Sequence, residues 1–193
     1  MSRPRPVQPR LLPVDEFTGE AAEIVSSAIT GPDGRPLNIF GTLAHHPKLM
    51  KRFNLFGGYL LAKGLLPARE REIVILRIGW NARSVYEFGQ HTVIGRSAGL
   101  TDDEIASLAS DDPAATGTWS DDDLLLIALA DELDADDCVS DETFAGLAKR
   151  WNEDQLIELV VCAGFYRLVS GFLNTMGVQL DDGVPGWPSS STT

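Results

Sequence analysis

The side chains best suited to chemistry lie between Glu72 and His91. Ser84, Glu87 and His91 are spaced i, i+3 and i+7, which places all three on one face of a helix. Glu87 and His91 are one helical turn apart, so a carboxylate and an imidazole can meet there. Glu72 lies on the preceding apolar segment and reaches the same place if the two segments form a hairpin. Such a group beside apolar walls is typical of general acid–base chemistry near neutral pH.

Each of these residues also has a structural explanation. His91 could be a core histidine bonded to a backbone carbonyl, and Glu87 could pair with Arg83 on an exposed helix face. Glu72 could pair with Arg69, although its apolar neighbours favour desolvation and a raised pKa. The clustering of three titratable groups favours the functional interpretation, with His91, Glu87 and Glu72 as catalytic residues.

Three further residues are predicted to bind the substrate. Ser84 lacks the GxSxG surroundings of an activated serine, so we interpret it as a small pocket residue or hydrogen-bond donor. Arg77 and Arg167 are candidates to hold a substrate carboxylate, because a guanidinium offers a bidentate fork. Trp80 and the aromatic pair at 165–166 are interpreted as core or subunit-interface residues.

The elements that position these residues are helical. Helix start signals such as Thr101-Asp-Asp-Glu recur along the chain, whereas no stretch alternates apolar and polar residues over five or more positions. The fold class is therefore all-α, with about eight helices. We expect helices at 18–30, 37–46, 47–63, 67–79, 82–97, 101–109, 120 onward, 140–151 and 152–176, with a break at 79–81 and a loop at 111–119. Prolines predict an extended arm at 1–16, followed by one helical domain at 17–177 and a mobile or partner-bound tail at 178–193.

Composition narrows the classes of partner. The 193 residues are 44% hydrophobic and 23% charged, which is ordinary for a globular protein, and the net charge of −12 argues against nucleic acid and anionic membranes. The apolar runs at 73–76 and 124–130 are too short to span a bilayer, and the start of the chain lacks a signal peptide, so we expect a cytoplasmic location. Cys138 and Cys162 form no CxxC pair and have no spacing suited to a zinc site, and a disulfide framework is not expected.

The central and C-terminal segments resemble the carboxymuconolactone decarboxylase family, which includes alkylhydroperoxidase D. The resemblance rests on Arg-Glu-Arg-Glu-Ile-Val-Ile-Leu at 69–76, Tyr-Glu-Phe at 86–88, His91, Ala-Gly-Leu-Thr at 98–101 and the segment at 159–177. It covers roughly residues 35 to 180. The resemblance implies an alkylhydroperoxidase D-like helical bundle that assembles as a homotrimer or homohexamer and uses no metal and no organic cofactor.

The hydroperoxidase branch of the family has a glutamate, a CxxC pair and a histidine. The glutamate corresponds to Glu72 and the histidine to His91, but the two cysteines correspond to Ser84 and Glu87. Because peroxide reduction there needs an attacking thiolate and a resolving thiol, this chain cannot follow that mechanism. The decarboxylase branch is the better match, since it uses acid–base residues to remove carbon dioxide from an unsaturated lactone acid.

The leading hypothesis is a cofactor-free lyase that acts on a small unsaturated organic acid or lactone. The alternatives are an alkylhydroperoxidase-type antioxidant protein and a non-catalytic, ligand-binding helical oligomer. Burial of the Glu72, Glu87 and His91 cluster beside a cavity would favour the enzyme over the binding protein. On this hypothesis His91→Ala should abolish most turnover and leave the fold intact, whereas loss of both cysteines should change turnover little.

Overall fold

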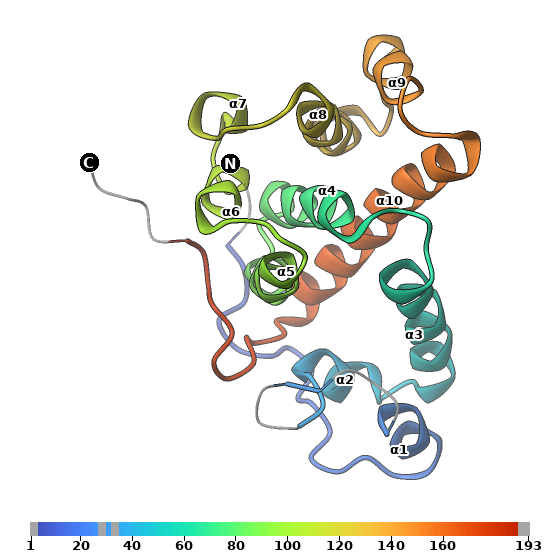
Figure 1. The fold of residues 1–193 in the computed structure, drawn as a ribbon. Coiled ribbons are helices and arrows are strands. Elements are labelled where there is room, and N and C mark those ends of the chain that lie inside the picture. Colours follow the sequence, from blue (N-terminus) through green and yellow to red (C-terminus); the bar gives the residue numbers. More distant parts are fainter. Residues whose placement is uncertain (1–3, 27–29, 32–34, 189–193) are drawn as a thin grey trace.

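The structure is a computed structural model that describes residues 4–26, 30–31 and 35–188. Within these residues the chain forms helices and no strand, which confirms the all-α prediction (Figure 1). The helices are α1 Gly19–Val25, α2 Asn38–Leu43, α3 Pro47–Ala62, α4 Ala68–Asn81, α5 Val85–Ser97, α6 Asp102–Leu108, α7 Pro113–Thr116, α8 Asp121–Asp136, α9 Asp141–Leu147 and α10 Glu153–Met176. Parts of the predicted arm, first helix, following loop and tail, at 1–3, 27–29, 32–34 and 189–193, lie outside the described residues.

Local side-chain signals explain most of these boundaries. Capping boxes start α6, α8 and α10, where the side chain of the first residue of each pair accepts a hydrogen bond from the backbone of the second: Thr101–Glu104, Ser120–Asp123 and Asn152–Gln155. The short helix α7 was predicted as loop. It forms because the Asp112 side chain caps its start and Pro113 supplies the first helical φ angle.

Helices α4 and α5 form the predicted antiparallel hairpin. The predicted break at 79–81 is wrong, because α4 continues to Asn81 and the chain turns at 82–84, where Arg83 adopts a left-handed φ of 53°. Gly79 instead permits a close approach between the helices. A Cβ atom at Gly79 would lie 3.3 Å from the backbone nitrogen of Phe88 on α5.

The core is built around α4, which is packed between α5, α8 and α10 (Figure 1). Its residues from Ile73 to Leu76 are all fully buried. A helix that is apolar on every side belongs at the centre of a bundle, because each face can then be covered by another helix. Glu72 is part of this run and is itself 0% exposed, so its carboxylate must be compensated from within the protein.

The C-terminal tail packs on the body of the same chain over the described residues 178–188. Asp181 accepts hydrogen bonds from the backbone nitrogen of Asn38 (2.8 Å) and from the side chains of Tyr86 and Gln90 (both 2.6 Å). The Trp187 ring packs on Phe88 of α5, with ring centroids 5.1 Å apart. This part of the tail is thus held by α2 and α5 of its own chain.

Helix α10 is long and apolar enough to cross a membrane by length and composition alone, and it is the single such helix among the described residues. Its packing differs from that of a lipid-facing span. Leu159, Cys162 and Ala163 are 0% exposed and belong to the same core cluster as α4. One face of α10, which includes Cys162, is therefore part of the core.

Candidate active site

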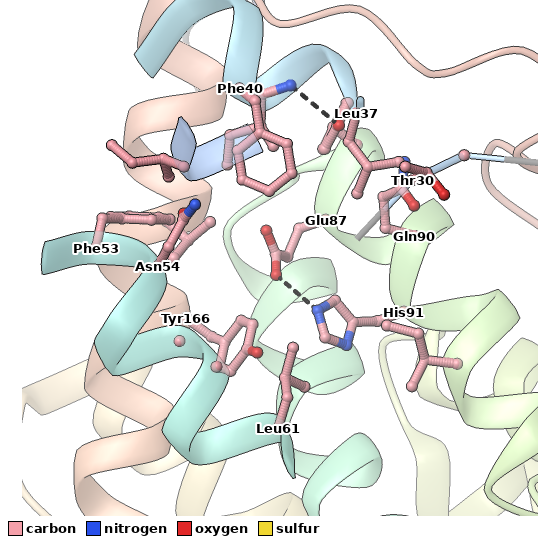
Figure 2. Close-up of a pocket in the computed structure, with 18 of the residues that line it drawn as sticks. Thr30, Leu37, Phe40, Phe53, Asn54, Leu61, Glu87, Gln90, His91 and Tyr166 are labelled. Carbon is pink, nitrogen blue, oxygen red and sulfur yellow. Dashed lines mark hydrogen bonds and ion pairs between the residues drawn. The ribbon is translucent and has the colours of Figure 1, made fainter. Parts of the chain in front are cut away.

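His91 is bound on both sides by carboxylates. Its Nδ1 atom lies 2.6 Å from Oε2 of Glu72, and its Nε2 atom lies 3.2 Å from Oε1 of Glu87. The Glu72 carboxylate comes from α4, and the Glu87 carboxylate comes from α5, one turn before His91 on the same helix. Figure 2 shows the ion pair between Glu87 and His91. Both ring nitrogens can donate to a carboxylate only when the imidazole is protonated, so this arrangement selects the imidazolium form.

The electrostatics of the cluster follow from this geometry. Burial alone would lower the pKa of His91, but Glu72 and then Glu87 outweigh it and raise the pKa from 6.5 to about 10. Arg71 extends the chain of charges, because its Nε atom lies 3.1 Å from Oε1 of Glu72. The four side chains form two buried cations and two buried anions in alternation, which makes the burial of each charge tolerable.

The cluster opens on a cavity of about 730 Å³. Glu87 and His91 line this cavity, whereas Glu72 lies behind His91 and does not. Figure 2 shows the side chains of Glu87, His91 and Tyr166 around the same space. Most of the remaining wall is apolar and comes from α2, α3, α5 and α10, and it includes Leu37, Ile39, Phe40, Phe53, Leu61, Ile94, Phe165 and Val169. A cavity of this size, with a few polar groups in an apolar wall, suits a small organic ligand.

The other predicted site residues lie elsewhere. Arg77 binds Asp131 of α8 and two backbone carbonyls, so its guanidinium ties α4 to α8 and does not face the cavity. Arg167 forms an ion pair with Asp134 on the outside of α10, also away from the cavity wall. Ser84 is the N-cap residue of α5, is fully buried and does not line the cavity. Its Oγ atom has no hydrogen-bond partner among the described residues.

Sequence reasoning also overlooked several cavity residues. Phe165 and Tyr166, predicted as core or interface, both line the cavity. Lys51 of α3 is the one lysine or arginine among the described residues of its wall. Gln90 adjoins His91 in the sequence and could have been inferred from the helical repeat. Lys51 and Tyr166 carry no such signal, because they reach the site only through the packing of α3 and α10.

Neither cysteine takes part in the cluster. Cys162 is 0% exposed, and burial together with the Glu72 charge raises the pKa of its thiol, which opposes thiolate formation. Cys138 is exposed just beyond α8, and neither residue lines the cavity. The described part of the chain therefore offers no thiol at the place where the His91 cluster meets the cavity.

Several solved structures share this fold. A peroxidase-related protein from Ralstonia eutropha JMP134, described as an alkylhydroperoxidase AhpD core, is 20% identical, with a TM-score of 0.74 over 86% of this chain and 91% of that one. A second peroxidase-related protein, from Silicibacter sp. TM1040, is 12% identical, with a TM-score of 0.80 over 95% and 97% of the two chains. At these identities the likeness concerns the fold, which is that of the alkylhydroperoxidase D-like helical proteins.

The sequence has a similarity of its own. Residues 47–128 match the model of the carboxymuconolactone decarboxylase family, and this segment contains no CxxC pair. The debrominase Bmp8, solved as a cysteine-to-alanine variant with 2,3,4-tribromopyrrole, is also similar in fold, at 13% identity and a TM-score of 0.69 over 91% of this chain and 93% of that one. No relative was found among curated proteins.

Proposed function

We propose that the protein is a cofactor-free lyase that removes carbon dioxide from a small unsaturated organic acid or lactone and protonates the carbon left behind. The observation that carries this proposal is the buried Glu72–His91–Glu87 cluster, of which the last two face an apolar cavity. The debrominase Bmp8, whose structure holds a tribrominated pyrrole, supports the use of this fold for chemistry on small rings.

Glu72 and Glu87 differ in their position relative to the cavity, so we assign them different roles. Glu72 holds Nδ1 of His91, is itself held by Arg71, and does not reach the cavity, so it is a positioning residue. Glu87 and His91 reach the cavity and can exchange a proton with a bound molecule. With a pKa raised to about 10, His91 carries its proton at neutral pH and supplies the acid.

The proposed reaction has two steps. First, the bond between the substrate carbon and its carboxylate breaks, carbon dioxide leaves, and the electron pair passes to the conjugated carbonyl oxygen. Second, the resulting dienolate takes a proton at carbon from Glu87 or His91, and the carbonyl re-forms. The proton that His91 gives up through this pair is regained from solvent, so the enzyme returns to its starting state.

The absence of arginine from the described part of the cavity wall limits the charge of the substrate. The carboxylates of Glu20 and Glu23 also line the cavity, and Lys51 is the cation available to hold a substrate carboxylate. We therefore propose a substrate with one carboxylate on an otherwise apolar body. Lys51→Met should raise KM for such an acid and leave the inhibition constant of its unreactive methyl ester unchanged, which steady-state kinetics of the acid with and without the ester can compare.

A screen of candidate acids in D₂O tests the proposal. Unsaturated lactone acids and related β,γ-unsaturated acids are incubated with enzyme, and NMR follows the loss of carbon dioxide and the entry of deuterium at carbon. We expect His91→Gln to lower turnover by about a hundred- to ten-thousand-fold, the usual range for a lost proton-transfer group. The variant Cys138→Ser with Cys162→Ala should retain turnover. Loss of turnover in that variant, with His91→Gln still active, would refute the mechanism.

The antioxidant alternative has a weaker basis. The positions of the family's cysteines hold Ser84 and Glu87, and the buried Cys162 thiol cannot reach the cavity. Oxidation of an added dithiol by peroxide tests the antioxidant function. If the oxidation persists in the double-cysteine variant, it does not depend on the protein's thiols, so the assay distinguishes a thiol peroxidase from the proposed lyase.

A further inference from the structure

The three tyrosines of the chain occupy three different environments, and one of them is unusual. Tyr59 is 44% exposed on α3 and does not line the cavity. Tyr86 lines the cavity, but its hydroxyl donates to Asp181 (2.6 Å) and accepts from the backbone nitrogen of Ile39 (3.2 Å). Tyr166 also lines the cavity, yet its hydroxyl has no hydrogen-bond partner among the described residues. Buried tyrosine hydroxyls usually have a partner, so this group is available to a ligand.

Tyr166 packs beside the acid–base cluster, and its hydroxyl reaches the cavity there. Its ring meets the His91 ring edge to face, with centroids 4.9 Å apart and an interplanar angle of 82°. The residue is 3% exposed. Its hydroxyl oxygen, unlike Oγ of Ser84, is not completely buried, so it reaches the cavity that the residue lines. Figure 2 shows the hydroxyl directed to the His91 side of that space.

The chemistry of the group fits hydrogen-bond donation. Burial, reinforced by the nearby carboxylate of Glu87, raises the pKa of Tyr166 well above 10, so the phenol stays protonated throughout the neutral range. A neutral donor in an apolar cavity interacts most strongly with an acceptor that carries negative charge. In the proposed reaction that acceptor is the carbonyl oxygen, which takes up the electron pair when carbon dioxide leaves.

We propose that the Tyr166 hydroxyl donates a hydrogen bond to the substrate oxygen that becomes anionic, beside the imidazolium of His91. This inference rests on the proposed function and extends it, because it places the substrate oxygen at the part of the cavity wall that α10 forms. The carbon that is protonated then lies toward Glu87 on α5. The packing of the Tyr166 ring on the His91 ring sets the distance between the sites for the anionic oxygen and for the protonated carbon of the substrate.

Binding of 4-nitrophenol tests the inference without turnover. Its phenolate carries a charged oxygen on a ring and absorbs at a longer wavelength than the neutral form, so titration reports both affinity and ionisation. We expect the wild-type protein to bind the phenolate, and Tyr166→Phe to weaken this binding roughly ten- to hundred-fold, the usual value of a hydrogen bond to a charged group. Nitrobenzene lacks the phenol oxygen, so both proteins should bind it with the same affinity. Tyr59→Phe is the matched control and should leave phenolate binding unchanged.

Thermal unfolding separates this role from a structural one. Tyr166→Phe should leave the melting temperature unchanged, because the hydroxyl makes no hydrogen bond within the described part of the protein, whereas Tyr86→Phe should lower it. A fall with Tyr166→Phe as large as that with Tyr86→Phe would make the hydroxyl structural and overturn the inference. Equal phenolate affinity of wild type and Tyr166→Phe, or no binding by wild type, would also overturn it. The proposed function would survive these outcomes, since it depends on deuterium entry and on His91→Gln.

Discussion

His91 pairs with two buried carboxylates and offsets part of the cost of burying their charges. Glu72 is 0% exposed and Glu87 is 3% exposed, and each lies within 3.2 Å of an imidazole nitrogen. The imidazolium therefore stabilises the fold as well as supplying a proton. This dual role corrects the expectation that His91→Ala leaves the fold intact.

We predict that His91→Ala lowers the free energy of unfolding by about 3–5 kcal/mol, the usual cost of removing one partner from a buried ion pair. Urea unfolding monitored by circular dichroism measures this difference. Adding Glu87→Gln to His91→Ala should recover part of the loss, because Glu72 keeps its ion pair with Arg71 and Glu87 carries the charge that loses its ion-pair partner. A free energy of unfolding equal to that of wild type in His91→Ala would show that the cluster adds nothing to stability.

The raised pKa of His91 predicts a pH dependence with a definite sign. The folded state holds its proton up to about pH 10, whereas the unfolded chain releases it near 6.5, so the folded state binds more protons in between. The stabilisation by His91 is complete below about pH 6.5 and is lost as the pH rises toward 10. The difference in unfolding free energy between wild type and His91→Gln should therefore shrink over this interval. A difference that grows with pH would mean that the imidazole is neutral in the folded protein.

At the scale of single residues, the sequence located the cluster but not its internal order. Helical spacing was enough to bring Glu87 and His91 together, and a hairpin was enough to add Glu72. Which carboxylate faces the cavity depends on the rotation of α4 within the bundle, which residue spacing does not determine. The positions of Arg77 and Arg167 away from the cavity could not be foreseen for a related reason, because an arginine that pairs with another helix has the same sequence signature as one that binds a substrate.

At the scale of elements, the close packing of the C-terminal tail on α5 depends on Gly89. A Cβ atom at Gly89 would lie 2.3 Å from the carbonyl oxygen of Pro185, so no other residue fits beneath the tail without moving it. The tail also supplies Gly183 and Val184 to the cavity wall. Close packing between α5 and the tail thus links the C-terminal segment to the site.

We predict that Gly89→Ala displaces the tail and lowers the free energy of unfolding by about 1–3 kcal/mol, as overpacking typically does. Limited proteolysis should then cut the chain near residues 178–188 faster than in wild type. Gly164 on α10 is the matched control, because nothing lies within 4 Å of its Cβ position. Gly164→Ala should raise the free energy of unfolding by roughly 0.5–1 kcal/mol. Unchanged proteolysis in Gly89→Ala would show that the tail tolerates the added methyl group.

The elements themselves were the most predictable part of the molecule. Capping boxes and proline positions gave the starts of the longer helices, because these signals act within one turn of the chain. The break at 79–81 was misplaced, because Gly79 looks like a helix terminator in sequence and serves a helix–helix contact in the structure. The docking of the tail was missed, because it depends on contacts between residues that are far apart in the sequence, such as Gln90 with Asp181.

At the scale of the whole molecule, apolar side chains remain on the outside of two helices. Leu55 and Phe56 of α3 are 68% and 42% exposed, and Ile157 and Leu168 of α10 are 64% and 59% exposed. Helix α3 packs on α10, where the ring of Phe56 meets that of Phe165 edge to face at 5.0 Å. Apolar surface of this kind on neighbouring helices is typical of subunit interfaces.

We predict that the protein forms a homotrimer or homohexamer in which these faces of α3 and α10 are covered by other copies of the chain. Multi-angle light scattering at micromolar concentration and moderate salt should give three or six times the 20.9 kDa mass of one chain. Ile157→Glu with Leu168→Glu should lower that mass by opposing burial of the α10 face, whereas Lys149→Glu, which lies outside these faces, should not. A wild-type protein with the mass of one chain would refute the assembly and leave the cavity and its acid–base cluster to function within a single subunit.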